Sequence, residues 1–209
     1  PMDAGIGIKT KKLHLWSGTG DFMNLNDVLV DKTKVKNVMF GIKDSHFPFF
    51  GHVNTPQTAD TLQKCKNIPT DGTENCPDLS DAGWYVELDD RKKITAEPTM
   101  RGNAVYFPIY KPTTGSKSCG AGNAYICALN ADCGTNLSAQ LGSNTGAEAG
   151  EECYYVGVGV LSKIIAFGTK LYANISGTSE VYDPKDDLVI IEALAEDIDQ
   201  FRSSWRENF

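Results

Sequence analysis

Three side chains in one short segment have the chemistry to bind a metal ion: Asp44, His46 and His52. Imidazole nitrogens and carboxylate oxygens are common ligands of zinc. However, the two histidines lie six positions apart, which matches none of the usual ligand spacings. The segment is therefore more typical of a polar loop than of a metal site.

Two adjacent acid pairs, Asp89-Asp90 and Glu151-Glu152, have the chemistry of a general acid and a general base. Neighbouring acids at a turn are usually solvated instead. The chain has no G-x-S-x-G sequence for a serine nucleophile. Gly18-Thr-Gly20 and Gly157-Val-Gly159 are too short for a phosphate-binding loop and lack its lysine. We expect a protein that is not an enzyme.

The six cysteines favour disulfides over a zinc site, because their number is even, no Cys-x-x-Cys pair occurs and the chain has only three histidines. Buried free thiols are the alternative. Cys65 and Cys76 form the simplest pair, since both lie in one polar, turn-rich stretch. The sequence does not fix the connectivity. The disulfide candidates are Cys65, Cys76, Cys119, Cys127, Cys133 and Cys153.

The formal net charge of −7 argues against a polyphosphate partner, so we expect neither nucleic acid nor an anionic membrane surface as a ligand. No run of apolar residues approaches the roughly 18 that cross a bilayer, so no membrane span is expected. The chain opens with Pro1 rather than Met. It is therefore expected to be either a processed protein or a piece of a longer one.

Three phenylalanines surround a proline in the segment His46 to His52: Phe47, Phe49 and Phe50. Pro48 excludes a regular strand interior there. The rings either fill the base of the loop that follows or form an exposed contact surface for a partner subunit. The tryptophans are expected in sheet packing, where large rings bury much area: Trp16, Trp84 and Trp205.

The chain contains an internal repeat. Ile94 to Tyr110 and Val160 to Ser176 each combine an extended segment, a turn with Gly102 or Gly168, and an apolar strand, at an offset of 160 − 94 = 66 residues. Self-similarity of strand pairs at a fixed spacing is typical of repeat folds, in which one unit cannot bury its apolar face alone. The pattern predicts a propeller-like array of blades.

Grouping the expected strands gives three sets. An early blade uses Leu13 to Ser17, Asn37 to Lys43 and Trp84 to Leu88, and a second uses 94–99, 104–110 and 125–129. A third begins at Gly157 within the expected strand Tyr154 to Val160, continues through the expected strands Lys163 to Phe167 and Leu171 to Ile175, and is followed by an ambiguous segment, 187–195, that we assign as a strand. We predict an all-β, partial and modified β-propeller of about two and a half to three antiparallel blades.

Such a ring does not close, and open strand edges are rarely tolerated in soluble proteins. We therefore expect the remaining propeller segment, or another polypeptide, to complete the sheet. Two long polar insertions, 51–80 and 130–152, interrupt the strands. Matching strands flank both, so they do not divide the chain into domains and residues 1–209 form one unit.

Several phrases, in order along the chain, resemble the C-terminal propeller of the PilY-type pilus tip and assembly proteins. They are Ser17-Gly-Thr-Gly-Asp-Phe, Met39-Phe-Gly-Ile-Lys-Asp, Gly83-Trp-Tyr-Val-Glu-Leu, Ala96-Glu-Pro, Val105-Tyr-Phe, Ser118-Cys-Gly-Ala-Gly-Asn-Ala-Tyr and Ser204-Trp-Arg-Glu. The resemblance implies a secreted β-propeller of the cell surface, exported through the periplasm, that acts in type IV pilus assembly and adhesion. It implies minor pilins or the pilus filament as partners, and that the N-terminal half of the ring is absent from this chain.

The family's calcium loop, of the D-x-D-x-[DN]-G kind, is not present here. Asp183, Asp186 and Asp187 lack its spacing and its glycine, so calcium at these three side chains is only an alternative and no metal or cofactor is assigned. The scattered oxygen ligands after Gly20 also lack a bidentate glutamate at the required distance: Asp21, Asn24, Asn26 and Asp27.

Two other functions stay open. Ala124 to Asn130 resembles the Y-A-L-D-x-x-T-G blade motif of quinoprotein dehydrogenases, which would make the chain a fragment of such an enzyme, although that motif joins blades and indicates nothing about catalysis. A surface carbohydrate-binding module is the other alternative, and it would need tryptophans or tyrosines exposed on one face. Neither the sequence composition nor the spacing of these residues distinguishes the two.

Overall fold

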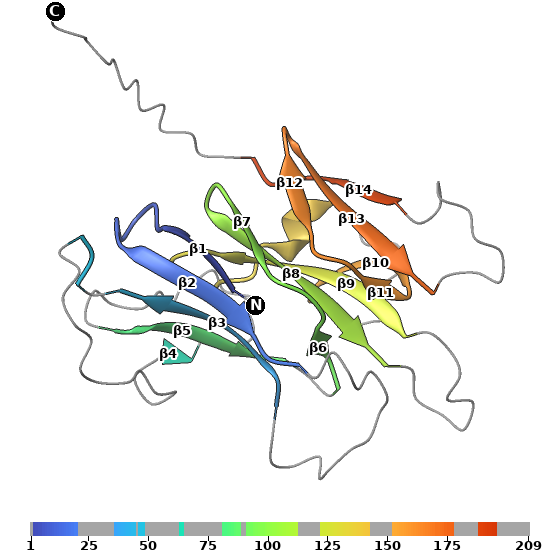
Figure 1. Cartoon of the computed structure of the whole chain (residues 1–209), viewed down its shortest axis with the longest axis horizontal. Helices are drawn as coiled ribbons and strands as arrows, with labels where there is room; N and C mark the ends of the chain where they lie inside the picture. Colours follow the sequence, from blue (N-terminus) through green and yellow to red (C-terminus); the bar gives the residue numbers. More distant parts are fainter. Residues whose placement is uncertain are drawn as a thin grey trace, which may run out of the picture.

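The computed structural model of the chain describes residues 2–20, 36–44, 46–48, 63–64, 81–88, 91–112, 122–142, 152–177 and 188–195. Three β-sheets lie side by side in chain order, from the blue and teal strands to the orange and red ones (Figure 1). The described part contains a short 3₁₀ helix, η2 (Ser138–Leu141). No helix within it has the length and apolar character to cross a bilayer.

The first sheet has the strand order β1-β2-β3-β5-β4. All its pairs are antiparallel except β4, which runs parallel to β5. The strands are β1 (Met2–Ile6), β2 (Leu13–Gly18), β3 (Val38–Lys43), β4 (Gln63–Lys64) and β5 (Gly83–Glu87). Burial alternates along β2 and β3, which indicates that one face packs on the rest of the molecule.

The second sheet has the order β10-β9-β8-β6, with β7 also pairing with β8. Its strands are β6 (Lys93–Ile94), β7 (Thr99–Arg101), β8 (Ala104–Lys111), β9 (Asn123–Asn130) and β10 (Tyr154–Val158). Seven consecutive residues are buried in each of β8 and β9. Such unbroken apolar runs are typical of strands that are covered on both faces of a sheet.

The third sheet consists of β11 (Val160–Leu161), β12 (Ile165–Phe167), β13 (Lys170–Ser176) and β14 (Leu188–Glu192). Strands β11, β12 and β14 all pair antiparallel with β13. Burial alternates strictly along β13. The third sheet is therefore covered on one face only, unlike the second.

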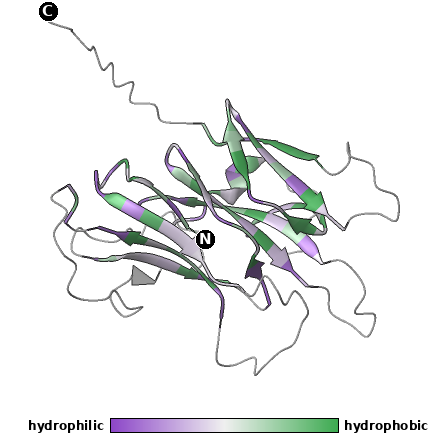
Figure 2. Cartoon of the chain, in the orientation of Figure 1, coloured by the Kyte–Doolittle hydropathy of each residue, from purple (hydrophilic) through white to green (hydrophobic). Residues whose placement is uncertain are grey.

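The middle sheet separates two apolar cores. The core between the first and second sheets includes Trp16, Met39 and Trp84 with Val105, Phe107 and Tyr125. The core between the second and third sheets is built from small and aliphatic side chains: Ala104, Ala124, Ile126, Ala128, Leu161, Ile164, Leu171, Ala173, Ile175 and Ile191, together with Tyr106. Apolar segments follow the strands of all three sheets in Figure 2.

The repeat predicted from the sequence is present in the strand register. In the hairpin of β7 and β8, Thr99 lies opposite Tyr106. In the hairpin of β12 and β13, Ile165 lies opposite Tyr172, at the same offset of 66 residues (165 − 99 and 172 − 106). The two turns contain glycines of matching backbone angle, φ 56° at Gly102 and 58° at Gly168. The second and third sheets are thus copies of one supersecondary unit.

Pro108 lies inside β8, where a proline would normally break a sheet. Its carbonyl accepts the backbone N–H of Thr95 at 3.1 Å, so its nitrogen faces the same neighbouring side. The pairing on that side is interrupted between β6, which pairs with residues 109 and 110, and β7, which pairs with 104–106. The missing N–H of the proline therefore points at the interruption and does not cost a bond in a continuous ladder.

The all-β, partial-propeller prediction is confirmed, and the ambiguous segment after residue 186 contains a strand as assigned. The predicted third blade was wrong at its start. The predicted strand Tyr154 to Val160 is two strands in two sheets, because Gly159 (φ 133°) separates β10 from β11 and β10 pairs with β9. The third unit therefore begins at Val160 rather than Gly157.

Candidate functional site

The polar cluster richest in contacts is built on a tight turn that follows β9. Asn130 shapes it: its side-chain Oδ1 accepts the backbone N–H groups of Asp132 and Cys133, both at 3.0 Å. Its backbone carbonyl accepts the N–H of Gly134 at 2.8 Å. Gly134 has φ 69°, a conformation that favours glycine. We call residues 130–134 the docking turn.

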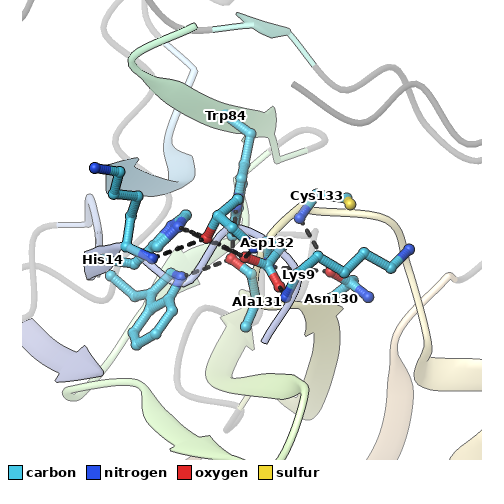
Figure 3. Close-up of polar contacts among 10 residues, drawn as sticks. Lys9, His14, Trp84, Asn130, Ala131, Asp132 and Cys133 are labelled. Atoms are coloured by element: carbon cyan, nitrogen blue, oxygen red, sulfur yellow. Dashed lines mark hydrogen bonds and ion pairs between the residues drawn. The ribbon is translucent and has the colours of Figure 1, made fainter. Parts of the chain in front are cut away.

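The docking turn contacts the first sheet through a single carbonyl oxygen. The Ala131 carbonyl accepts the indole N–H of Trp16 and that of Trp84, each at 3.0 Å (Figure 3). Both indoles are fully buried. A buried indole N–H needs an acceptor, so this one oxygen satisfies both tryptophans and fixes how the second sheet lies against the first.

Gly41 provides room for the two indoles. A Cβ atom at this position would lie 2.8 Å from atoms of both Trp16 and Trp84. Since Gly41 lies opposite Trp16 on one side and Trp84 on the other, it is the centre of a three-strand row in the first sheet. The Met39-Phe-Gly-Ile phrase noted in the sequence thus places its glycine where the rings need space.

Asp132 joins the same turn to the loop between β1 and β2. Its Oδ2 accepts the backbone N–H of Lys9 at 2.9 Å. Its Oδ1 accepts the hydroxyl of Thr10 at 2.7 Å and the backbone N–H of Thr10 at 3.3 Å. The carboxylate is buried, and these bonds replace the water that it loses. The contact joins residues more than 120 positions apart in the chain.

His14 completes the cluster. Its Nε2 lies 2.9 Å from Thr10 Oγ1 and 3.6 Å from Asp132 Oδ1. Since the single hydroxyl proton of Thr10 goes to Asp132, the imidazole donates from Nε2. Its Nδ1 has no hydrogen-bond partner among the described residues. Burial lowers the pKa of His14 below its ordinary value of 6.5, and the nearby Lys43 acts in the same direction, while Asp132 opposes them.

A threonine, a histidine and an aspartate in contact invite comparison with a nucleophilic triad. In such a triad the histidine accepts the proton of the hydroxyl. Here the Thr10 hydroxyl donates to Asp132 instead, and the histidine is a donor to Thr10. His14 and Asp132 are both buried. The geometry holds a loop in place and offers no activated nucleophile at Thr10.

The predicted disulfide cysteines are placed in part. Cys127 on β9 is bonded to Cys153, which directly precedes β10. This pair was left open by the sequence, and it crosslinks two neighbouring strands of the second sheet. Cys133 in the docking turn is also disulfide-bonded. The predicted pair Cys65 with Cys76 lies outside the described residues, as does Cys119.

The segment after β3 is described for residues 46–48 only, so Phe49, Phe50 and His52 lie outside the described residues. Phe47 is half-buried, precedes a cis peptide bond to Pro48, and its carbonyl accepts Lys12 Nζ at 2.7 Å. The Asp44 carboxylate accepts the backbone N–H of His46 at 2.9 Å. These contacts order the start of the loop and do not decide between the two readings of the phenylalanines.

Among the described residues, no group of three or more His, Cys, Asp or Glu side chains is arranged to hold a metal ion. Asp183, Asp186 and Asp187, the alternative calcium ligands, lie outside that part of the chain, as do Asp21, Asn24, Asn26, Asp27, Asp89, Asp90 and Glu151. Glu152 is half-buried, and its carbonyl accepts Asn136 Nδ2 at 3.0 Å.

An exposed apolar face on the third sheet was missed by the sequence reasoning. Large hydrophobic side chains of β12 and β14 project from it: Ile165, Phe167, Leu188 and Ile190. The signal was present in the sequence, because apolar residues at every second position on one face and again on the other indicate a strand covered on both sides. We call this surface the outer face.

Comparison with known proteins gives a match in fold. The chain is similar to the crystal structure of the Pseudomonas aeruginosa PilY1 C-terminal domain, with a TM-score of 0.56 and 13% sequence identity. The match covers 91% of this chain and 43% of that one, so this chain spans less than half of the matched protein. No family model and no curated protein matches the sequence. The resemblance to the PilY-type C-terminal propeller is thus confirmed at the level of the fold.

Proposed function

We propose that this protein is an extracellular, pilus-associated protein that acts by binding other proteins and not by catalysis. The observation that carries the proposal is the likeness of its fold to the PilY1 C-terminal domain over 91% of the chain. A fold alone does not define a function, so the site must be compatible with it. The polar cluster at the docking turn joins sheets, which fits a protein that presents surfaces.

Two further features support this role. The Cys127–Cys153 disulfide is typical of proteins that leave the reducing cytosol. The outer face of the third sheet exposes several large apolar side chains on neighbouring strands, which is typical of a surface that binds protein. In this role the partners are the remaining propeller segment or another polypeptide that completes the sheet, and minor pilins or the pilus filament. The protein then serves as an adhesin or a pilus biogenesis factor.

Deleting the gene in the source organism tests the proposal. We expect the protein in the fraction sheared from the cell surface, and less pilin in that fraction after deletion, with recovery when the gene is restored. The control is a restored gene that encodes Lys170→Gln, an exposed change outside the sheet cores. Surface pilin that is unchanged by the deletion would contradict the proposal.

The dehydrogenase alternative has its own test. The segment that resembles the quinoprotein motif runs into the docking turn, where its residues hold the first and second sheets together. An absorbance spectrum of the purified protein is expected to show protein bands alone. A quinone band at longer wavelength would replace the proposal by an enzyme of that class.

A further inference from the structure

The outer face of the third sheet is apolar at its centre. Ile165 on β12, Tyr172 on β13 and Ile190 on β14 lie opposite one another and form one row across three strands. Ile165 is 61% exposed and Ile190 is 51% exposed. Leu188 and Phe167 flank this row on β14 and β12, at 45% and 76% exposure. Figure 2 shows apolar segments on both of these strands.

Polar groups border the apolar centre at its ends. Lys170 and Glu192 lie opposite each other beyond the central row, with Nζ and Oε1 3.7 Å apart. Asn174 lies opposite Leu188 at the other end. An apolar centre with a polar border is the usual anatomy of a protein contact surface.

The repeat identifies what covers the equivalent face one unit earlier. Tyr172 corresponds to Tyr106 in the second sheet, and the strand partners of these tyrosines are Ile190 and Ala128. By the same register, Leu188 corresponds to Ile126, because their partners Asn174 and Pro108 are 66 residues apart (174 − 108). The outer face of the third sheet is therefore the same face of the unit as the one formed by Tyr106, Ile126 and Ala128.

In the second sheet this face is completely covered. Tyr106 and Ala128 are 0% exposed and Ile126 is 1% exposed. The covering surface is the inner face of the third sheet, with Leu171, Ala173 and Ile175 at alternate positions of β13. The same face therefore has two environments in one molecule, buried under a β-sheet in the second unit and uncovered in the third.

Hydrogen bonds also cross the covered face. The Tyr106 hydroxyl accepts the backbone N–H of Leu194 at 3.1 Å, and Thr99 Oγ1 donates to the carbonyl of Ile164 at 2.5 Å. Tyr172 carries the same hydroxyl at the equivalent position, and it is half-exposed. A partner that covers the outer face in the same way would offer a backbone N–H to Tyr172.

We infer that the outer face of β12, β13 and β14 binds a further antiparallel β-sheet, one that presents aliphatic side chains at alternate positions as β13 does toward the second sheet. The inference deepens the proposed function, because it names the surface and the kind of partner through which the protein acts. The repeat favours a sheet over a second copy packed through its own outer face, since the contact within the molecule joins unlike faces, outer to inner.

A photo-crosslinking amino acid at one position tests the inference. Phe167 is replaced by benzoylphenylalanine in the protein at its full natural length, in the cells that make it, and the crosslinked peptides are sequenced by mass spectrometry. Phe167 is chosen because it is an exposed aromatic residue at the border of the face. Val158 on β10, which is also exposed but belongs to the second sheet, is the matched control position.

The expected product is a crosslink from position 167 to a peptide with aliphatic residues at every second position, and none to that peptide from position 158. Ile190→Lys should lower its yield by about tenfold or more, because a charge would enter the centre of the contact. Since Ile190 is exposed, this variant is expected to unfold at the same urea concentration as the unchanged protein.

Three results would overturn the inference: a crosslink to residues 188–192 of a second copy, a peptide without the alternating pattern, or no peptide at all. The outcome is separable from that of the proposed function. A crosslink to an alternating strand together with unchanged surface pilin after gene deletion would retain the docking face and remove the pilus role.

Discussion

The two interfaces between the sheets are held together by different means. Between the first and second sheets, directional polar contacts dominate: two indole N–H groups share the Ala131 carbonyl, and Asp132 binds the loop after β1. Between the second and third sheets, small and aliphatic side chains interlock. The first interface joins unlike units, whereas the second joins two copies of one repeat.

The difference shows how each interface sets its register. In the repeat, equal backbone geometry already places one unit on the next, so apolar packing and a few hydroxyl bonds such as Thr95 Oγ1 to the Leu161 carbonyl are sufficient. The first sheet lacks that matching geometry. Its position depends on buried donors that have a single acceptor, and hydrogen bonds of this kind cost much when their partner is removed.

The largest expected effect comes from the first interface. Trp84→Ala should lower the free energy of unfolding by about 5 kcal/mol, because it removes a fully buried ring and one of the two bonds to Ala131. Leu171→Ala in the second interface should cost about 3 kcal/mol. Urea unfolding followed by far-ultraviolet circular dichroism measures both. Equal losses would show that the two interfaces do not differ in strength at these positions.

Removing the carboxylate of the docking turn is expected to have the next largest effect. Asp132→Ala leaves the N–H groups of Lys9 and Thr10 and the Thr10 hydroxyl without their acceptor, at a cost of about 3 kcal/mol. Asp3→Ala is the matched control, since Asp3 accepts the N–H of Met100 in a more exposed position and should cost about 1 kcal/mol. Asp132→Asn keeps an oxygen acceptor and should fall between the two. If both alanine variants cost the same, the buried cluster has no special weight.

Much of the fold could be predicted from local sequence. The apolar runs of β8 and β9 and the offset of 66 residues indicated the paired units, and Trp16 and Trp84 are buried in sheet packing as expected. Trp205 lies outside the described residues. Strand β1 was missed because its sequence, Met-Asp-Ala-Gly-Ile, has low strand propensity, and it is stabilised by pairing with β2.

The candidate site could not be predicted in the same way. Thr10 and Asp132 lie 122 residues apart, and no local pattern indicates that a loop after β1 meets a turn after β9. The only local signal was the sequence Asn130-Ala-Asp-Cys-Gly, whose asparagine and glycine are typical of a turn. The contact is a product of how the first two sheets stack, and stacking is set by side chains from many strands.

Acid should weaken the first interface before the second. The pKa of His14 is lowered below 6.5 in the folded protein, mainly by burial, so the unfolded chain binds this proton more readily. The contribution of His14 to stability is therefore fully present above pH 6.5 and is lost as the pH falls toward the folded-state pKa. We expect the free energy of unfolding to decrease in this range, and His14→Gln to reduce the pH dependence. His46→Gln, at an exposed position, is the control and should leave the slope unchanged.

The smallest effect is expected at the surface pair that bridges the two repeats. Lys163 Nζ lies 2.5 Å from Glu97 Oε2, and this bond lowers the pKa of Glu97 and raises that of Lys163. Both groups are exposed, so solvent and salt screen their attraction. Lys163→Gln should shift the urea midpoint less than Asp3→Ala does, and the shift should vanish near about 1 M salt, where the screening length is about 3 Å. Lys170→Gln, which removes a longer pair within one sheet, is the control. A shift that persists in salt would mean that the second interface, too, depends on a directional contact, and the contrast between the two interfaces would narrow.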